Sequence, residues 1–149
     1  NPTGVPYCID AIIIPNPSGR TQVIANSRDG YGNGAWFFCV GFSNKLVICS
    51  WDNSGSYNEI VCGTVLSAGT QCHVAAVKVG TTWTVYLDGI SDGSGSLPDS
   101  FSDRVIKIGY HNSANHHDFH GHMRAVRITK GVARYTSSFT PPTAPFPKS

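Results

Sequence analysis

Apolar and polar positions alternate along much of this chain with a period of two, which is typical of β-strands. The clearest case is the segment Thr82–Leu87, where Trp83, Val85 and Leu87 fall on one face while Thr84 and Tyr86 fall on the other. This pattern predicts a strand with one buried face and one face that is wet or lightly covered.

Similar short runs, separated by turn residues, recur along the chain at a spacing typical of an all-β sandwich. Phe42–Lys45, Gly80–Thr81 and Asp88–Gly89 predict three hairpin turns. The polar, glycine-rich segment Ser91–Ser102 is expected to be a loop. Strands are predicted over Tyr7–Ile14, Gln22–Ser27, Trp36–Phe42, Lys45–Trp51, Asn58–Leu66, His73–Lys78, Thr82–Leu87, Arg104–Tyr110 and His120–Thr129.

Composition supports the all-β prediction and a single folded domain. Of the 149 residues, 24 are Val or Ile against 4 Leu, and there is one Glu, so good helix formers are scarce. Residues 1–139 are expected to form a sandwich of two packed antiparallel sheets. Residues 140–149 contain four prolines and predict an extension that packs on the sandwich or trails from it. The chain starts with Asn and its one Met is Met123, which predicts a piece of a longer protein.

The charge pattern argues against nucleic-acid partners, and the length of the apolar runs argues against membrane insertion. The formal net charge is +2 and the basic residues are scattered, whereas a nucleic-acid groove normally needs a coherent basic stripe. The longest apolar runs, Ala11–Ile14 and Ala35–Val40, are far shorter than the roughly 20 residues that cross a bilayer. We therefore expect neither nucleic-acid binding nor membrane insertion.

Five cysteines give an odd count without a CxxC pair. Cys39 and Cys49 are candidates to face each other across one turn, and Cys62 and Cys72 across the next. The alternative is that they are small buried thiols that stay reduced in a cytoplasm. Sequence alone leaves the pairing open.

Five of the six histidines lie between residues 111 and 122. On a strand, His120 and His122 point to the same side, and His116 or Asp118 is placed to complete a transition-metal site. The alternative is a polar loop that leads into a strand whose outward positions are His. Calcium is a second candidate ion, because Arg28–Gly34 and Asp52–Gly55 offer oxygen donors in loops. The same residue types also form turns without any ion.

Aromatic and short polar residues share several loops, a mixture that suits sugars because a pyranose offers both an apolar face and hydroxyls. The alternative is that Trp51 packs on the core at a strand end while Tyr57 caps the opposite strand. The ligand hypothesis gains weight if these loops cluster on one edge of the sandwich. The candidate ligand-binding residues are Asp29, Tyr31, Asn33, Trp51, Asp52, Asn53, Tyr57 and His111.

Enzymatic activity is not expected. Glycoside hydrolysis usually needs two carboxyl groups about 5 to 9 Å apart, yet Glu59 is the single Glu and the E-x-D-x-x-E strand of laminarinase-type enzymes is absent. The closest Asp pairs, such as Asp88 and Asp92, lie in the Gly/Ser-rich region. Neither a G-x-S-x-G elbow nor a phosphate-binding loop occurs.

The C-terminal third carries a specific family resemblance. The run VRITKGVARYT at residues 126–136, followed by FTPP at 139–142 and APF at 144–146, resembles the ending of concanavalin A-like (laminin G-like) jelly-roll domains of bacteriophage tail and tail-fibre proteins. Weaker matches upstream are CIDA at 8–11, HVA at 73–75, WTVYLDG at 83–89 and FHGHM at 119–123. The resemblance implies a jelly-roll sandwich of the concanavalin A-like lectin/glucanase type.

The same resemblance implies a non-enzymatic module of a phage tail or fibre that recognises a glycan on a bacterial surface, located in the virion or outside the cell. The alternatives are a structural virion module and a secreted bacterial adhesin module. The chain departs from the family in two places. Arg124 and Ala125 stand where family members often have an acidic pair, and only six residues precede Tyr7, where the family usually has a further strand. The second predicts either a short edge strand or an edge that another copy covers in a homo-oligomer.

Overall fold

The computed structural model describes residues 4–27, 34–98, 105–111 and 117–146, and these residues form strands, turns and irregular segments without a helix. The predicted all-β class is therefore confirmed, and this part of the chain has no helix that could cross a membrane. The strands are β1 (Tyr7–Pro15), β2 (Gln22–Asn26), β3 (Trp36–Val40), β4 (Lys45–Trp51), β5 (Tyr57–Val65), β6 (Cys72–Val79), β7 (Thr82–Leu87), β8 (Ile90–Ser96), β9 (Lys107–Ile108) and β10 (Gly121–Lys130).

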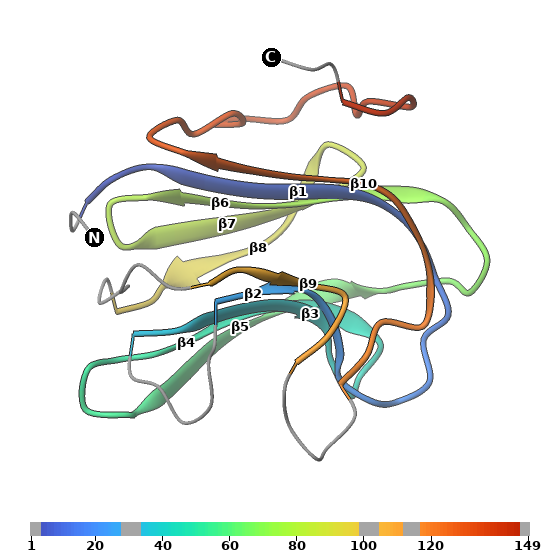
Figure 1. Ribbon diagram of the computed structural model, residues 1–149. Coiled ribbons are helices and arrows are strands. Elements are labelled where there is room, and N and C mark those ends of the chain that lie inside the picture. The colour runs from blue at the N-terminus through green and yellow to red at the C-terminus, as the bar shows by residue number, and fades with distance from the viewer. Residues whose placement is uncertain (1–3, 28–33, 99–104, 112–116, 147–149) are drawn as a thin grey trace.

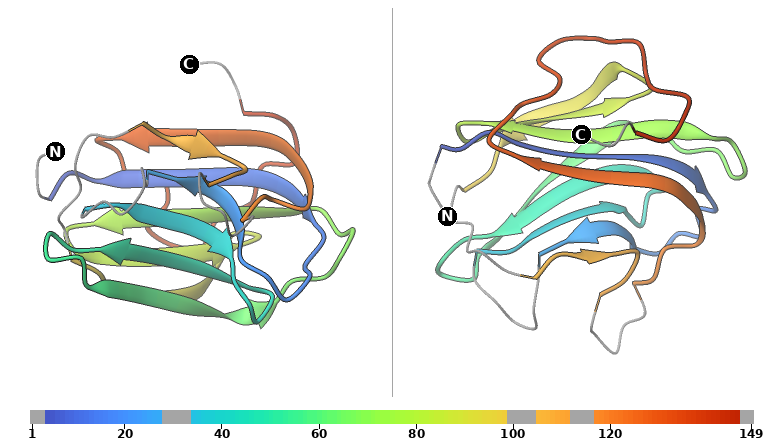
Figure 2. Two further views of the ribbon diagram at one scale, coloured as in Figure 1. Left: turned by 60° about the horizontal axis from the view of Figure 1, so that its bottom comes forward. Right: turned by 45° about the horizontal axis from the view of Figure 1, so that its top comes forward.

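The strands form two stacked antiparallel sheets (Figure 1, and from two further directions in Figure 2). The first sheet has the order β10-β1-β6-β7-β8 and the second the order β5-β4-β3-β2-β9. β1 pairs with β10 on one side and with β6 on the other. The expectation of an exposed edge at the strand beginning with Tyr7 is therefore wrong, because the last strand of the chain returns to cover that edge.

The main core lies between the two sheets and follows the period of two. In β1, Ile9, Ala11 and Ile13 point into the core, and Trp83 and Val85 do so from β7. From the second sheet, the alternate residues Phe38, Val40, Leu46 and Ile48 meet them. Burial of these side chains is the dominant stabilising contribution to the fold.

Strand β8 was not expected, because its sequence was interpreted as a loop. The Asp88–Gly89 turn has φ values of 49° and 80°, as a type I′ hairpin requires, so it directs the chain back along β7. Gly93 and Gly95 lie against Cys62 and Ile60 of β5, where an added Cβ would be 3.0–3.1 Å from the nearest atom. The glycines that suggested a loop therefore allow the edges of the two sheets to approach.

The strand predicted over Arg104–Tyr110 is also corrected. Only Lys107 and Ile108 are in a strand, paired with Asn26 and Ala25 of β2, and Arg104 lies outside the described residues. Beyond β9, the edge of β2 is covered by an irregular segment, since the Val23 amide donates to the His117 carbonyl at 2.9 Å.

Residues 131–146, here called the C-terminal strap, lie across the outer face of the first sheet (Figure 1, red). Tyr135 and Phe139 pack on a small cluster of Cys8, Ala75, Val77 and Tyr86. The Phe139 amide also donates to the Gly89 carbonyl at 3.0 Å. Tyr86, on the face of β7 expected to be wet or lightly covered, is buried under this strap.

Candidate functional site

The outer face of the second sheet carries a second apolar cluster, separate from the core between the sheets. Alternate residues of β3 and β4 point to this face, and the cluster consists of Val23, Phe37, Cys39, Val47 and Cys49, with Trp51 packed against it. Outer faces of antiparallel sheets are usually polar because water covers them. An apolar outer face therefore marks a place where other groups cover the sheet.

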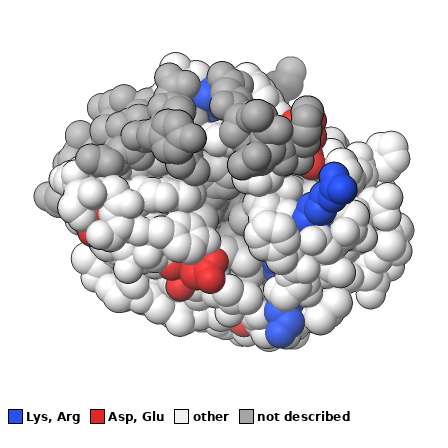
Figure 3. Space-filling view, turned by 90° about the horizontal axis from the view of Figure 1, so that it is seen from below, with Lys and Arg blue, Asp and Glu red and all other residues white. Residues whose placement is uncertain are grey.

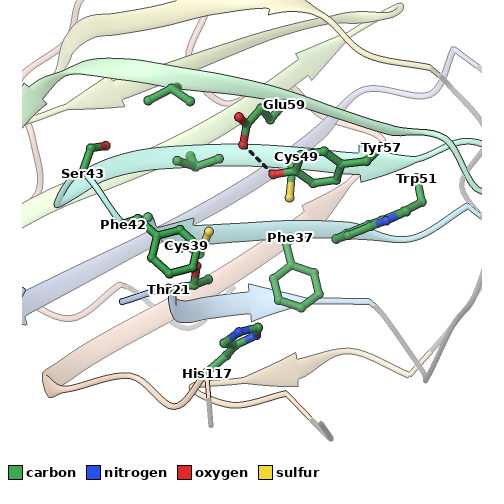
Figure 4. A pocket seen from close by; sticks show the side chains of 13 residues that line it. Thr21, Phe37, Cys39, Phe42, Ser43, Cys49, Trp51, Tyr57, Glu59 and His117 are labelled. Carbon is green, nitrogen blue, oxygen red and sulfur yellow. Dashed lines mark hydrogen bonds between the residues drawn. The ribbon is translucent and has the colours of Figure 1, made fainter. Parts of the chain in front are cut away.

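A groove of about 490 Å³ runs over this cluster (Figure 4). Its size is within the range of about 300–1,000 Å³ that small-molecule sites occupy. Strands β3, β4 and β5 supply the floor, and the turn between β3 and β4 supplies one end. The described lining residues are Thr21, Phe37, Cys39, Gly41, Phe42, Ser43, Val47, Cys49, Trp51, Tyr57, Glu59, Val61 and His117.

Aromatic rings contact one another in a continuous row along the groove. The ring centroids of Phe37 and Trp51 are 5.5 Å apart and those of Trp51 and Tyr57 are 5.1 Å apart. On the other side, Phe37 meets the His111 ring at 5.0 Å, and His111 stacks on His117 at 6.0 Å. These distances are typical of favourable aromatic pairs, so each ring supports its neighbour's orientation.

The rings differ in exposure, which separates a buried floor from an accessible rim. Phe37 is 3 % exposed, whereas Tyr57 is 50 % and Phe42 is 74 % exposed. Tyr57 and Trp51 are cross-strand partners at the ends of β5 and β4. The rim can therefore present ring surface to a ligand, while the floor excludes water.

One hydrogen bond joins two polar groups of the rim. The Tyr57 hydroxyl donates to Glu59 Oε2 at 2.5 Å, and the two side chains point toward each other across the groove wall (Figure 4). Burial, the neighbouring Cys49 and the bond to Glu59 raise the pKa of the Tyr57 phenol well above its ordinary range. Tyr57 therefore stays a hydrogen-bond donor at neutral pH.

The cysteines of the floor do not provide a nucleophile. All five cysteines are free and buried. Burial raises the pKa of the Cys39 thiol, and the neighbouring Cys49 raises it further. Cys39 and Cys49, candidates to face each other, do not pair across the strands, because Cys39 is opposite Val47 and Cys49 is opposite Phe37. The thiols instead act as small apolar groups of the floor.

Charge is sparse among the described residues on this side of the molecule. Seen from the side of the second sheet, scattered Lys, Arg, Asp and Glu side chains stand among uncharged surface (Figure 3). Among the described residues that line the groove, Glu59 is the one carboxylate and none is Lys or Arg. The pair of carboxyl groups that glycoside hydrolysis normally uses is thus not present in the described lining.

The structure brings together part of the predicted ligand-binding set. Trp51 and Tyr57 line the groove, and His111 lies beside its floor through Phe37. Asp52 and Asn53 follow Trp51 in the turn between β4 and β5 and are not among the lining residues. Asp29, Tyr31 and Asn33 lie outside the described residues, so their role stays a prediction.

The Asp52 carboxylate forms a turn. Its Oδ1 accepts hydrogen bonds from the Ser54 amide, the Ser54 hydroxyl and the Ser56 amide at 2.6–2.9 Å. The hydrogen bonds from Ser54 and Ser56 lower the pKa of this carboxyl. Such Asx-type bonding stabilises the turn without an ion. The second calcium candidate, Arg28–Gly34, lies outside the described residues except for Gly34.

The transition-metal hypothesis is not tested in full. Within the described parts of the chain, no three His, Cys, Asp or Glu side chains are grouped to hold a metal ion. His116 lies outside those parts. Asp118 and His120 precede β10, and His122 is opposite Ile14. The site of His116, Asp118, His120 and His122 therefore stays a prediction.

Most of the floor was not predicted from the sequence. The missed lining residues are Phe37, Cys39, Val47 and Cys49 of β3 and β4, together with Thr21, Gly41, Phe42, Ser43, Glu59, Val61 and His117. A signal was present: in WFFCV and LVIC both alternating positions are apolar, which indicates a strand covered on both faces. The core accounts for one of these faces, and the groove accounts for the other.

Comparison with known proteins places this fold in a recognised superfamily. Residues 3–134 match the family model described as the concanavalin A-like lectin/glucanases superfamily. No curated protein matches the chain in a sequence search.

Several solved structures share the fold. A Bacteroides ovatus protein to which carbohydrate binding is ascribed has a TM-score of 0.67 at 21% identity, over 87% of this chain and 38% of its own. The CBM40 module of Ruminococcus gnavus IT-sialidase has a TM-score of 0.66 at 10% identity, over 86% and 76%. The enzymatically active domain of tailspike protein 2 from bacteriophage CBA120 has a TM-score of 0.59 at 14% identity, over 83% and 22%. The chain thus spans well under half of the Bacteroides protein.

Proposed function

Since the chain belongs to the concanavalin A-like lectin/glucanases superfamily, we propose that it is a carbohydrate-binding module that catalyses no reaction and holds its sugar in the groove over the second sheet. The observation that carries this proposal is the row of aromatic rings along that groove, with Tyr57 and Glu59 providing polar atoms at the rim. A ring under the apolar face of a pyranose and polar groups beside its hydroxyls are the two contacts that sugars need.

The known relatives in fold support this class of ligand. The Bacteroides protein has carbohydrate binding ascribed to it, and the Ruminococcus module has been described bound to α2,3-sialyllactose. At 21% and 10% identity these likenesses show the fold alone. The ligand itself is inferred from the groove.

We further propose that the module belongs to a phage tail or fibre and recognises glycans on a bacterial surface, in the virion or outside the cell. The C-terminal run at residues 126–146 supports this context through its resemblance to tail proteins. Many copies on one particle multiply a weak single-site affinity, so millimolar to micromolar binding, roughly, is sufficient.

A second candidate is a structural module that contacts a neighbouring protein, including another copy of itself. One observation favours it. Val105, Ile108 and Tyr110, in and around the edge strand β9, are 67%, 48% and 46% exposed. Edge strands with apolar neighbours are sites of protein pairing. An adhesin module of a secreted bacterial protein remains the third alternative.

A titration with bacterial surface polysaccharides tests the first proposal. Trp36 and Trp83 are buried in the core, whereas Trp51 lines the groove. A bound sugar should therefore change the fluorescence of Trp51. Trp51→Ala should weaken binding by at least about tenfold through loss of the ring contact, and Trp51→Phe should retain part of the affinity without the fluorescence change.

The matched control is Ile90→Ala, an exposed apolar residue of the first sheet, which should leave the affinity unchanged. Tyr31→Ala tests the predicted loop in the same assay. If the wild-type protein binds and neither Trp51→Ala nor Tyr31→Ala reduces the affinity, the site assignment is wrong while the function stands. If no polysaccharide or oligosaccharide binds, the carbohydrate function is wrong and the structural candidate gains support.

A further inference from the structure

We infer that the groove selects uncharged glycans over anionic ones, and that Glu59 is the residue that determines this selectivity. The inference rests on the proposed function, which it deepens by naming the class of sugar. It comes from the charge of the groove lining and from the position of one hydrogen-bonded carboxylate.

In the part of the lining that the structure describes, there is a negative charge and no Lys or Arg to offset it. Among its described residues, Glu59 is the one carboxylate, and there is no Lys or Arg. A sugar carboxylate in this groove would meet the like charge of Glu59, and the repulsion between the two would weaken its binding. The whole chain has a formal net charge of +2, which attracts anions weakly, so selectivity against anions must come from this local charge.

The position of Glu59 suits hydroxyl donors. Its Oε2 accepts the Tyr57 hydroxyl, which orients the carboxylate at the rim and leaves Oε1 available to accept from a ligand. Hydrogen bonds from sugar hydroxyls to an ionised carboxylate are short and stronger than those between neutral groups. The same carboxylate therefore favours a neutral sugar and disfavours an acidic one.

The floor adds to the discrimination. Phe37, Val47 and Cys49 are almost fully buried apolar groups beneath the groove. A ligand carboxylate placed over them loses part of its hydration without gaining an ion pair, which costs free energy. A neutral ring loses little by the same contact.

The test uses matched neutral and acidic probes that share one ring: methyl glucoside with methyl glucuronide, methyl galactoside with methyl galacturonide, and lactose with 3′-sialyllactose. Titrations are run at pH 8, where a histidine of ordinary pKa near 6.5 is neutral. We expect each acidic probe to bind about three- to tenfold more weakly than its neutral partner, the range set by one like-charge contact at a partly solvated site. Because salt screens exposed charges, the ratio should shrink at 1 M NaCl.

Glu59→Gln retains the shape of the side chain and removes its charge. It should weaken the binding of neutral probes and narrow the difference between acidic and neutral probes, leaving the smaller part of the difference that comes from the apolar floor. Asp88→Asn is the control, because it changes the net charge equally in the turn after β7, outside the groove, and should leave the ratio as in the wild-type protein. The His73 amide bonds to Asp88 Oδ1, a contact that Asn can retain.

The outcomes separate the inference from the function on which it rests. If acidic probes bind as tightly as their neutral partners or more tightly, the selectivity is wrong and the carbohydrate function stands. If Asp88→Asn alters the ratio as much as Glu59→Gln, overall charge is responsible and the role of Glu59 is wrong. If no probe of either kind binds, the carbohydrate function is overturned, and the selectivity with it.

Discussion

The two outer faces of this sandwich differ in what covers them. The first sheet is covered by the protein's own C-terminal strap, whose Tyr135 and Phe139 rings stack 3.7 Å apart over it. The second sheet carries the open groove. Both faces are more apolar than a water-covered sheet, yet the C-terminal strap covers one, while the described residues leave a groove over the other. Coverage therefore distinguishes the face that stabilises the fold from the face to which we assign ligand binding.

The chemistry beneath the two coverings also differs. Under the strap, the Asp10 carboxylate is 0% exposed and accepts two hydrogen bonds from Arg127, at 3.0 and 2.7 Å. Tyr135 donates to the same carboxylate at 3.0 Å, and His73 lies 3.2 Å away. The Phe146 ring lies 4.1 Å from the Arg127 guanidinium. A buried charge is tolerated only when its partners are complete, which requires the strap. The described residues that line the groove share one side-chain hydrogen bond, between Tyr57 and Glu59, and form no network of this kind.

Among the variants that test this comparison, Asp10→Ala is expected to change the free energy of unfolding most. It leaves the Arg127 guanidinium without its carboxylate beneath the strap, which should lower the free energy of unfolding by about 3–5 kcal/mol, measured by urea denaturation. Asp92→Ala removes a partly exposed carboxylate whose partner is Thr64, and should cost less than about 1 kcal/mol. Equal losses for the two variants would mean that the buried network contributes little. If the Asp10→Ala protein remains folded, its sugar affinity should be that of the wild-type protein, because Asp10 lies on the opposite face.

Trp51→Ala should show the reverse behaviour, with a large effect on binding and a smaller effect on stability. Trp51 is partly buried and contacts Phe37 and Tyr57. Loss of these contacts should lower the free energy of unfolding by about 1–2 kcal/mol in the same urea assay. A loss as large as that of Asp10→Ala would contradict the division between the two faces, since Trp51 would then be a principal support of the fold.

The smallest expected effect is on the acid sensitivity of the covered face. Burial raises the pKa of Asp10, but hydrogen bonds from His73, Arg127 and Tyr135 outweigh it, so the pKa lies below its ordinary value of 3.8. The unfolded chain then binds this proton more readily than the folded protein does. The stabilisation is therefore complete above about pH 4 and is lost as the pH falls toward the folded pKa. Urea midpoints at pH 5 and pH 3 should differ more for the wild-type protein than for Asp10→Asn, and parallel pH profiles would contradict this assignment.

Strand positions could be predicted from local sequence where the period of two was clear. Lys45–Trp51 and Thr82–Leu87 are strands over the predicted residues, and Asn44, in the predicted Phe42–Lys45 turn, has a φ of 59°. β8 was missed because its Gly93 and Gly95 are required by contact with β5, a neighbour that is about 30 residues away along the chain. Its local pattern is that of a loop, and tertiary packing overrides this pattern.

The candidate site could be predicted only in part. Trp51 and Tyr57 were identified from loop composition, because aromatic residues beside short polar ones are a local signal. Phe37 and Val47 were not, since the doubly apolar pattern of their strands indicates that both faces are covered without telling which residues face the other sheet. Glu59 was not, since an exposed charged residue in a strand is an ordinary surface position. Separating the two faces of a strand requires knowing which face of each sheet is stacked on the other sheet.

The class of fold and the position of most strands follow from the sequence, because β-branched residues, alternation and turn residues are signals that span only a few consecutive positions. Which apolar face the C-terminal strap covers, and which one carries a groove among the described residues, depends on the tertiary structure. The tertiary structure also brought Asp10 to Arg127, at opposite ends of the chain, and lined up Phe37, Trp51 and Tyr57 along one groove. Such contacts depend on the pairing order of strands, which joins residues distant in sequence and leaves no periodic trace in either partner.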